Sequence, residues 1–148
     1  MKMATEFSEL YRRYLAALVL FHLVAADEVG LSGTDYQANN ILEIDGPMTS
    51  GELAQRLGLS TGATTRLIDR LVETGYARRI DDARDRRRVL VEHTGHMPAE
   101  LDVLLAEVRV PIGEVLGSLT AEQREGVVRY FEGSTAAYRA ATAGIRSS

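Results

Sequence analysis

The stretch "TSGELAQRLGLSTGATTRLIDRLVETGY", residues 49–76, holds the signals for two short amphipathic helices in immediate succession. Its first residue, a threonine, is followed three positions later by Glu52, which is the spacing of a capping box, and Gly58 ends this first helix. Ser60 begins the second helix and Gly75 ends it. Because very few residues around Gly58 separate the two helices, the sequence predicts a helix-turn-helix.

The segments on either side extend this motif. Upstream, "LSGTDYQANNILEI" places Ser32 as the cap of a helix that ends at Asp45. Downstream, "YARRI" and "RRVLVEH" favour strands and flank the turn-forming "DDARD". A hairpin that directly follows a helix-turn-helix is a wing, so residues 32–96 are expected to form a winged helix-turn-helix.

The two ends of the chain have helical periodicity and apolar stripes. A stripe after Pro98 is expected to bend at Pro111, and Thr120 with Gln123 predicts the cap of a final helix. The stripes contain Phe7, Leu10, Tyr11, Tyr14, Leu18 and Phe21 in the first helix, and Leu101, Leu104, Leu105, Val108, Ile112, Val115, Leu116 and Leu119 near the other end. The fold class is therefore mainly α with a small β-hairpin wing, in which residues 1–31 and 97–148 form a helical dimerisation region. We expect a homodimer because these helices have more apolar surface than the central module covers. A monomeric helical bundle is the alternative.

Composition restricts the function classes. The 148 residues include no cysteine, which excludes disulfides and thiolate metal sites. The apolar run at residues 15–26 is too short to cross a bilayer, and the nearby Glu6, Glu9 and His22 are unlike a secretory signal. We therefore expect a cytoplasmic protein.

Positive charge is concentrated in one part of an acidic chain. The net charge is −4, yet residues 78–88 contain six arginines beside three aspartates. Residues 60–93 together carry a net charge of +2 and the remainder −6. Such segregation favours a polyanionic partner for the wing. A solvated hairpin in which the aspartates pair with the arginines is the alternative.

One face of the 60–74 helix is polar and suits a DNA major groove. Hydroxyl groups and methyl groups contact base edges, arginines contact guanine or phosphate, and glycine permits close approach of the backbone. The candidate residues of this face are Ser60, Thr61, Gly62, Thr65, Arg66 and Arg70. An exposed helix face is polar whatever its function, so the prediction of DNA binding depends largely on the arginines of the wing.

Residues for other functions are sparse. The histidines are His22, His93 and His96, and their spacing is not a recognised metal-ligand pattern. No serine has the context of a nucleophile, and no glycine-rich phosphate loop is present. We expect no enzyme activity, no cofactor and no metal. A metal sensor and a winged-helix protein-interaction module without DNA binding are the alternatives.

Residues 46–94, "GPMTSGELAQRLGLSTGATTRLIDRLVETGYARRIDDARDRRRVLVEHT", resemble the winged helix-turn-helix of the multiple-antibiotic-resistance regulator (MarR) family of bacterial transcriptional regulators. The segments "LIDRL" and "DARDRR" at this separation are the specific part. The resemblance implies a homodimer that recognises a pseudo-palindromic operator and acts as a repressor. It assigns Arg66 and Arg70 to bases or phosphates. It also implies that Asp69 and Arg87 pair, which braces the wing against the recognition helix.

The resemblance also indicates how the wing and an effector would act. It implies that the wing tip at residues 82–87 enters the flanking minor groove, with Arg84, Arg86 and Arg87 as the DNA-binding residues of the wing. Members of the family commonly release DNA when a small phenolic or aromatic acid binds between the dimer helices and the winged domain. The residues with polar tips that we expect to line such a site are Tyr11, Tyr14, His22 and Tyr36. The alternative is that each is a core or boundary residue.

Overall fold

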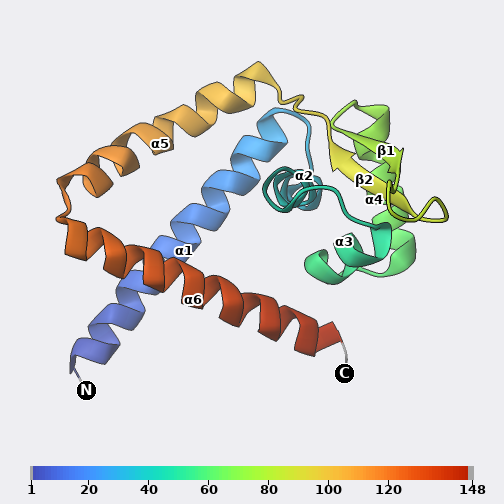
Figure 1. Cartoon of the computed structure of the whole chain (residues 1–148). Helices are drawn as coiled ribbons and strands as arrows, with labels where there is room; N and C mark the ends of the chain where they lie inside the picture. The colour runs from blue at the N-terminus through green and yellow to red at the C-terminus, as the bar shows by residue number, and fades with distance from the viewer. Residues whose placement is uncertain (1, 147–148) are drawn as a thin grey trace.

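The computed structural model describes residues 2–146, and the side chains of residues 6–145. Within this part of the chain there are six helices and one antiparallel hairpin, which confirms the predicted fold class. A compact winged helix lies at one side of the molecule, and three long helices form an open arch beside it (Figure 1). In chain order the elements are α1 (Lys2–Glu28), α2 (Gly33–Asp45), α3 (Ser50–Leu57), α4 (Thr61–Glu73), β1 (Ala77–Asp81), β2 (Val89–His93), α5 (Ala99–Ser118) and α6 (Ala121–Arg146).

The predicted helix caps are present. The side chain of Ser32 accepts a hydrogen bond from the third amide of α2, and Ser60 does the same for α4. Thr49 and Glu52 form a complete capping box at the start of α3, with distances of 3.2 and 2.7 Å. Thr120 and Gln123 form another before α6. Each cap satisfies amide groups that have no partner within the helix, so the helices begin where these residues lie.

Gly58 makes the turn between α3 and α4. Its φ angle is +63°, in the left-handed region. This conformation is unfavourable for residues with a Cβ atom, but glycine adopts it without strain. The amide of Leu59 then donates to the carbonyl of Ala54 at 3.0 Å, which closes α3 before Ser60 starts α4. The two helices are thereby joined rigidly, as the helix-turn-helix prediction requires.

The wing is a two-stranded hairpin that is also tied to the front of α3. Its register pairs Ala77 with His93 and Asp81 with Val89. Met48, which precedes α3, exchanges two backbone hydrogen bonds with Val91 of β2, at 3.1 and 2.8 Å. β1 has the predicted length but begins one residue later, and β2 is shorter than the sequence predicted, because Arg87 and Arg88 belong to the loop.

The hydrophobic core belongs mainly to the winged helix. Its largest fully buried apolar side chains are Leu42, Leu53, Leu67, Ile68, Leu71 and Leu101. Leu101 comes from the start of α5, and Ala25 and Ala26 come from the end of α1. Of the three long helices, α1 and α5 therefore join this core at one end each, and α6 contributes no residue to it.

Elsewhere the long helices expose apolar side chains. α6 crosses α1, where Phe7 and Tyr130 meet edge to face with ring centroids 6.5 Å apart, as the crossing in Figure 1 shows. α5 continues through Pro111 without a break. Large apolar residues that remain exposed include Leu20 on α1, Val110 and Val115 on α5, and Phe131 and Tyr138 on α6.

Among the described residues, no single helix is both long and apolar enough to cross a bilayer. α1 and α2 meet the criterion of length and composition only when taken together, as a pair bent by 99°.

Candidate nucleic-acid interface

The outer face of α4 is exposed and polar. Thr61, Gly62, Thr65 and Arg66 lie on it, whereas Leu67 and its neighbours on the inner face are buried. The hydroxyl of Thr65 donates to the carbonyl of Thr61 at 3.0 Å, which leaves the lone pairs of the hydroxyl oxygen facing outward. The buried inner face holds the helix in place, so the outer face is a fixed surface that can follow a groove.

Arg70 is exposed beside this face, but its side chain is engaged in an ion pair within the chain. Its Nε donates to Oδ2 of Asp35 at 3.1 Å, and its Nη2 donates to Oδ1 at 2.7 Å. Asp35 lies in α2 and is only 7% exposed, so its charge requires a partner. The hydrogen bond to this carboxylate raises the pKa of Arg70 above its ordinary value. The side chain predicted to contact DNA therefore joins α4 to α2.

The predicted brace between Asp69 and Arg87 is wrong in its arginine. Asp69 accepts a hydrogen bond from Arg79 of β1 at 2.5 Å. Arg87 instead donates through its Nε to Asp85, in its own loop, at 3.1 Å. The reason is distance along the chain: β1 follows α4 after one short turn, while Arg87 lies in the loop beyond the end of the strand pair. The brace from wing to recognition helix is thus made by Arg79.

Two aspartates hold the conformation of the wing loop, and two arginines of the loop remain without an ion pair among the described residues. Oδ1 of Asp82 accepts from the amide of Arg84 at 2.9 Å, and Oδ1 of Asp85 accepts from the amide of Arg87 at 3.1 Å. The hydrogen bond from the Arg87 side chain is the largest of the effects that lower the pKa of Asp85 below its ordinary value, so this carboxylate is ionised at neutral pH. In the described part of the chain, the guanidinium groups of Arg84 and Arg86 form no ion pair.

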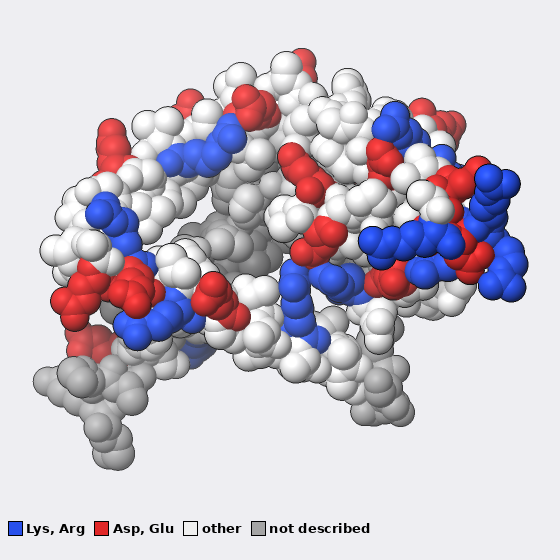
Figure 2. Space-filling view, viewed as in Figure 1, with Lys and Arg blue, Asp and Glu red and all other residues white. Residues whose placement is uncertain are grey.

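The six arginines of the wing therefore divide into two groups. Four are paired within the chain: Arg78 with Glu92 at 2.6 Å, Arg79 with Asp69, Arg87 with Asp85, and Arg88 with Glu52 and Asp82 at 3.6 and 3.8 Å. The remaining two project from the loop. Lys and Arg side chains gather at the end of the molecule that the wing occupies, with Asp and Glu side chains among them (Figure 2). The wing therefore combines both alternatives that the sequence left open: its strands carry ion-paired arginines, and its loop presents Arg84 and Arg86 with unpaired positive charge among the described residues.

The four residues predicted to line an effector site do not form one site. Nδ1 of His22 and the hydroxyl of Tyr36 lie 3.0 Å apart, and their rings stack with centroids 5.5 Å apart. They line a groove between α1 and α2. Tyr11 and Tyr14 line a different groove, between α1 and α6. Eight residues of one helix separate Tyr14 from His22, which corresponds to about 12 Å.

The other two histidines have separate surroundings. Nδ1 of His93 accepts a hydrogen bond from the amide of Gly95 at 3.1 Å, and His96 stacks on Tyr76 with centroids 5.3 Å apart. Among the described residues no group of three or more His, Cys, Asp and Glu side chains is arranged to hold a metal ion. The arrangement gives the metal-sensor alternative no support.

Comparison with known proteins relates the winged helix to one family. Residues 29–88, from the end of α1 through the wing loop, match the family model described as the MarR family. Over 83 residues the chain is 48% identical to YcgE of Bacillus subtilis, an uncharacterized HTH-type transcriptional regulator. The matched segment is therefore similar to the MarR family, as the sequence motifs indicated. The alignment with YcgE covers 56% of this chain and 54% of that protein, so it spans about half of the relative's length.

Solved structures show that the fold of the family extends beyond the matched segment. A MarR family protein from Bacillus stearothermophilus superposes with a TM-score of 0.68 at 20% identity, over 93% of this chain and 96% of that one. A mutant of MarR from E. coli, solved in complex with operator DNA, superposes with a TM-score of 0.54 at 21% identity, over 88% and 93% of the two chains. The likeness in fold to these solved structures therefore extends to α1, α5 and α6.

Two contacts in this chain were not predicted from the sequence. Asp35 as the partner of Arg70 was not foreseen, nor was the contact of Arg88 with Glu52. The sequence signal for the second contact is weak: Glu52 is recognisable as a capping residue of α3, and the cap uses one carboxylate oxygen, so the other can accept an ion pair. No local pattern indicates the first.

Proposed function

We propose that this chain is a transcriptional regulator that binds double-stranded DNA as a homodimer, and that it is not an enzyme. The observation that carries the proposal is the exposed polar face of α4 beside a wing whose Arg84 and Arg86 form no ion pair with any residue that the structure describes. The fold is the one in which E. coli MarR was solved with operator DNA. A protein of this function works at the chromosome, in the cytoplasm.

Two copies would place two such surfaces side by side. The exposed apolar residues of α1, α5 and α6 support a dimerisation region made of residues 1–31 and 97–148. Residues 32–96 form the DNA-binding domain. A symmetric dimer then reads two half-sites about one helical turn, roughly 34 Å, apart, so the operator is pseudo-palindromic. Occupancy of such a site in front of a gene blocks transcription, which is the repressor function that we propose.

Each half-site is contacted at two places. Ser60, Thr61, Gly62 and Thr65 on the outer face of α4 approach base edges in the major groove, and Arg66 supplies the charge there. Arg84 and Arg86 reach the adjacent minor groove, where the negative potential attracts guanidinium groups. Arg87 stays near the backbone with its charge partly offset by Asp85.

The proposal is tested by measuring the affinity of the purified chain for DNA from its own upstream region at several salt concentrations. Arg86→Ala should weaken binding and reduce the slope of log affinity against log salt by about 2, because each of two wings loses one phosphate contact. Arg129→Ala, at an exposed site on α6, is the matched control and should leave the slope unchanged. A protein-interaction module would bind none of these duplexes, even at low salt.

We also infer that a small phenolic or aromatic acid releases the DNA by binding near His22 and Tyr36. The groove between α1 and α2 supports this, because the His22 and Tyr36 pair presents a polar edge beside apolar Val19 and Leu23. Benzoate and 4-hydroxybenzoate are suitable probes. They should weaken DNA binding by the wild type and have less effect on Tyr36→Phe; equal effects on both would remove this site from the proposal.

A further inference from the structure

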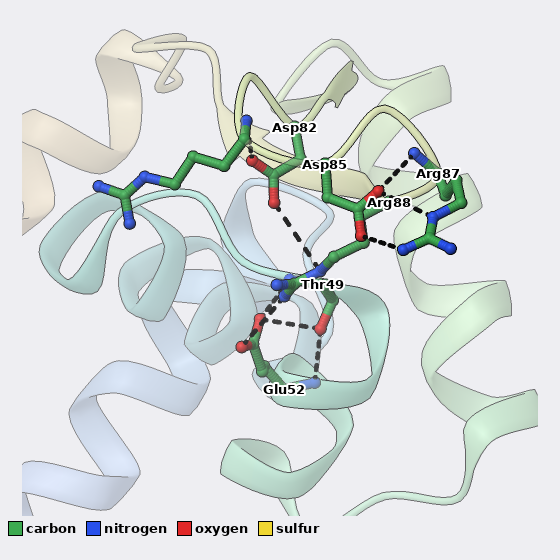
Figure 3. Close-up of polar contacts among 7 residues, drawn as sticks. Thr49, Glu52, Asp82, Asp85, Arg87 and Arg88 are labelled. Atoms are coloured by element: carbon green, nitrogen blue, oxygen red, sulfur yellow. Dashed lines mark hydrogen bonds and ion pairs between the residues drawn. The ribbon is translucent and has the colours of Figure 1, made fainter.

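The wing loop meets the start of α3 through Arg88 (Figure 3). The backbone of Arg88 closes the loop: its amide donates to the carbonyl of Asp85 at 2.9 Å, and its carbonyl accepts from the amide of Asp82 at 3.1 Å. Its side chain leaves the hairpin and extends toward α3. There Nη2 lies 3.6 Å from Oε1 of Glu52, while Nε lies 3.8 Å from Oδ2 of Asp82.

The carboxylates of Glu52 and Asp82 are each held in position by hydrogen bonds that do not involve Arg88. Oε2 of Glu52 accepts from the amide and the hydroxyl of Thr49, at 2.7 and 2.8 Å, so only Oε1 faces the wing. Hydrogen bonds from Thr49 are the largest of the effects that lower the pKa of Glu52, which is therefore ionised at neutral pH. Asp82 uses Oδ1 to turn the loop at Arg84 and leaves Oδ2 for Arg88. One guanidinium thus bridges two oxygens whose positions are set by separate turns.

We propose that Arg88 is a positioning residue for DNA binding, which holds the wing loop against the N-terminus of α3. Because α3 is joined rigidly to α4 through Gly58, a wing fixed to α3 is also fixed relative to the recognition helix. Arg84 and Arg86 then reach the adjacent minor groove at a constant distance from α4. The inference rests on the proposed function, since it assigns a role within DNA binding.

The competing explanation is that Arg88 contacts phosphate itself and that Glu52 only masks its charge. The side chain of Arg88 is 47% exposed, so its guanidinium is open to a ligand. The two explanations make opposite predictions for Glu52→Gln. Glutamine keeps the capping box and removes the negative charge. Unmasking Arg88 would tighten DNA binding, whereas release of the wing would weaken it.

The experiment measures affinity for the upstream DNA with Arg88→Ala, Glu52→Gln and the double variant. Exposed ion pairs are each worth up to about fivefold, and both wings of a dimer change together, so we expect Arg88→Ala to bind about five- to twentyfold more weakly. Glu52→Gln should bind about threefold or more weakly. The double variant should bind no more weakly than Arg88→Ala, because both changes break one contact.

Glu73→Gln is the control for charge alone. It removes an exposed acid from the same helix-turn-helix and should bind DNA as well as the wild type or better. Thermal unfolding followed by circular dichroism checks that all variants are folded. If Arg86→Ala weakens binding while Glu52→Gln strengthens it or has no effect, the role of Arg88 is refuted and the proposed function stands. A wild type that binds no DNA would overturn both.

Discussion

The winged helix of this chain buries its large apolar side chains, whereas the long helices expose many of theirs. In the winged helix, Leu53 and Leu67 are 0% and 1% exposed. On the long helices, Phe7 and Val115 are 63% and 62% exposed. Burial of one such side chain is worth about 1.5–3 kcal/mol, so the long helices leave a large stabilisation unused. A single chain is enough to bury the core of the winged helix. We infer that a second copy covers the exposed apolar residues of the long helices.

The largest expected effect comes from the core of the winged helix. Leu67→Ala should lower the free energy of unfolding by about 3 kcal/mol, because it leaves a cavity among α2, α3 and α4. Urea unfolding followed by circular dichroism measures this loss. Ile44→Ala is the matched control on α2, outside the proposed dimerisation region, where the side chain is 78% exposed, and it should cost less than about 1 kcal/mol. Equal losses for the two variants would erase the contrast between buried and exposed apolar residues.

The exposed stripe of α5 gives the next largest effect. Val115→Glu would place a carboxylate in the proposed dimer interface from each copy, and burial of such charges raises the dissociation constant by at least about 30-fold. Sedimentation velocity across a concentration series measures the change. Gln55→Glu introduces the same side chain and the same change of charge at an exposed site on α3, outside the proposed dimerisation region, and should leave the dissociation constant unchanged. A wild type that sediments as a monomer at micromolar concentration would contradict the dimer.

Arg70 and Arg66 test whether the surface of the winged helix is also committed to folding. Arg70→Ala leaves the buried Asp35 without its bidentate partner, so unfolding should become easier by about 1–2 kcal/mol. Arg66→Ala should leave stability within about 0.5 kcal/mol of the wild type and weaken DNA binding. Chemical unfolding and DNA titration of both variants separate the two roles. The assignment fails if Arg70→Ala weakens DNA binding without any loss of stability.

What the sequence predicted well is local. The caps at Ser32, Thr49, Ser60 and Thr120, together with the turn at Gly58, depend on residues within four positions of one another. Short-range hydrogen bonding decides such features, so spacing in the chain is enough to find them.

What it predicted less well depends on packing between elements. Whether Asp69 pairs with Arg79 or Arg87 depends on where β1 ends and how the loop turns, and several arginines of equal reach compete. Likewise, the separation of Tyr14 from His22 follows from α1 being one straight helix whose two halves meet different partners. Residue types identified the wing as cationic, but only the fold shows which arginines are free.

The smallest expected effect lies at the contact between the two regions. Arg139 of α6 donates to Oδ2 of Asp45, at the end of α2, at 3.2 Å, and Asp45 also accepts from Arg56. Both arginines are well exposed, so each ion pair is screened by solvent. Arg139→Ala should lower the free energy of unfolding by less than about 1 kcal/mol, and the difference should disappear in 1 M salt, where the Debye length is about 3 Å. Arg56→Ala, which shares the same acceptor within the winged helix, is the control of equal size. A much larger loss for Arg139→Ala than for Arg56→Ala would mean that α6 contributes to the stability of the winged helix, and the two regions would then fold as one unit.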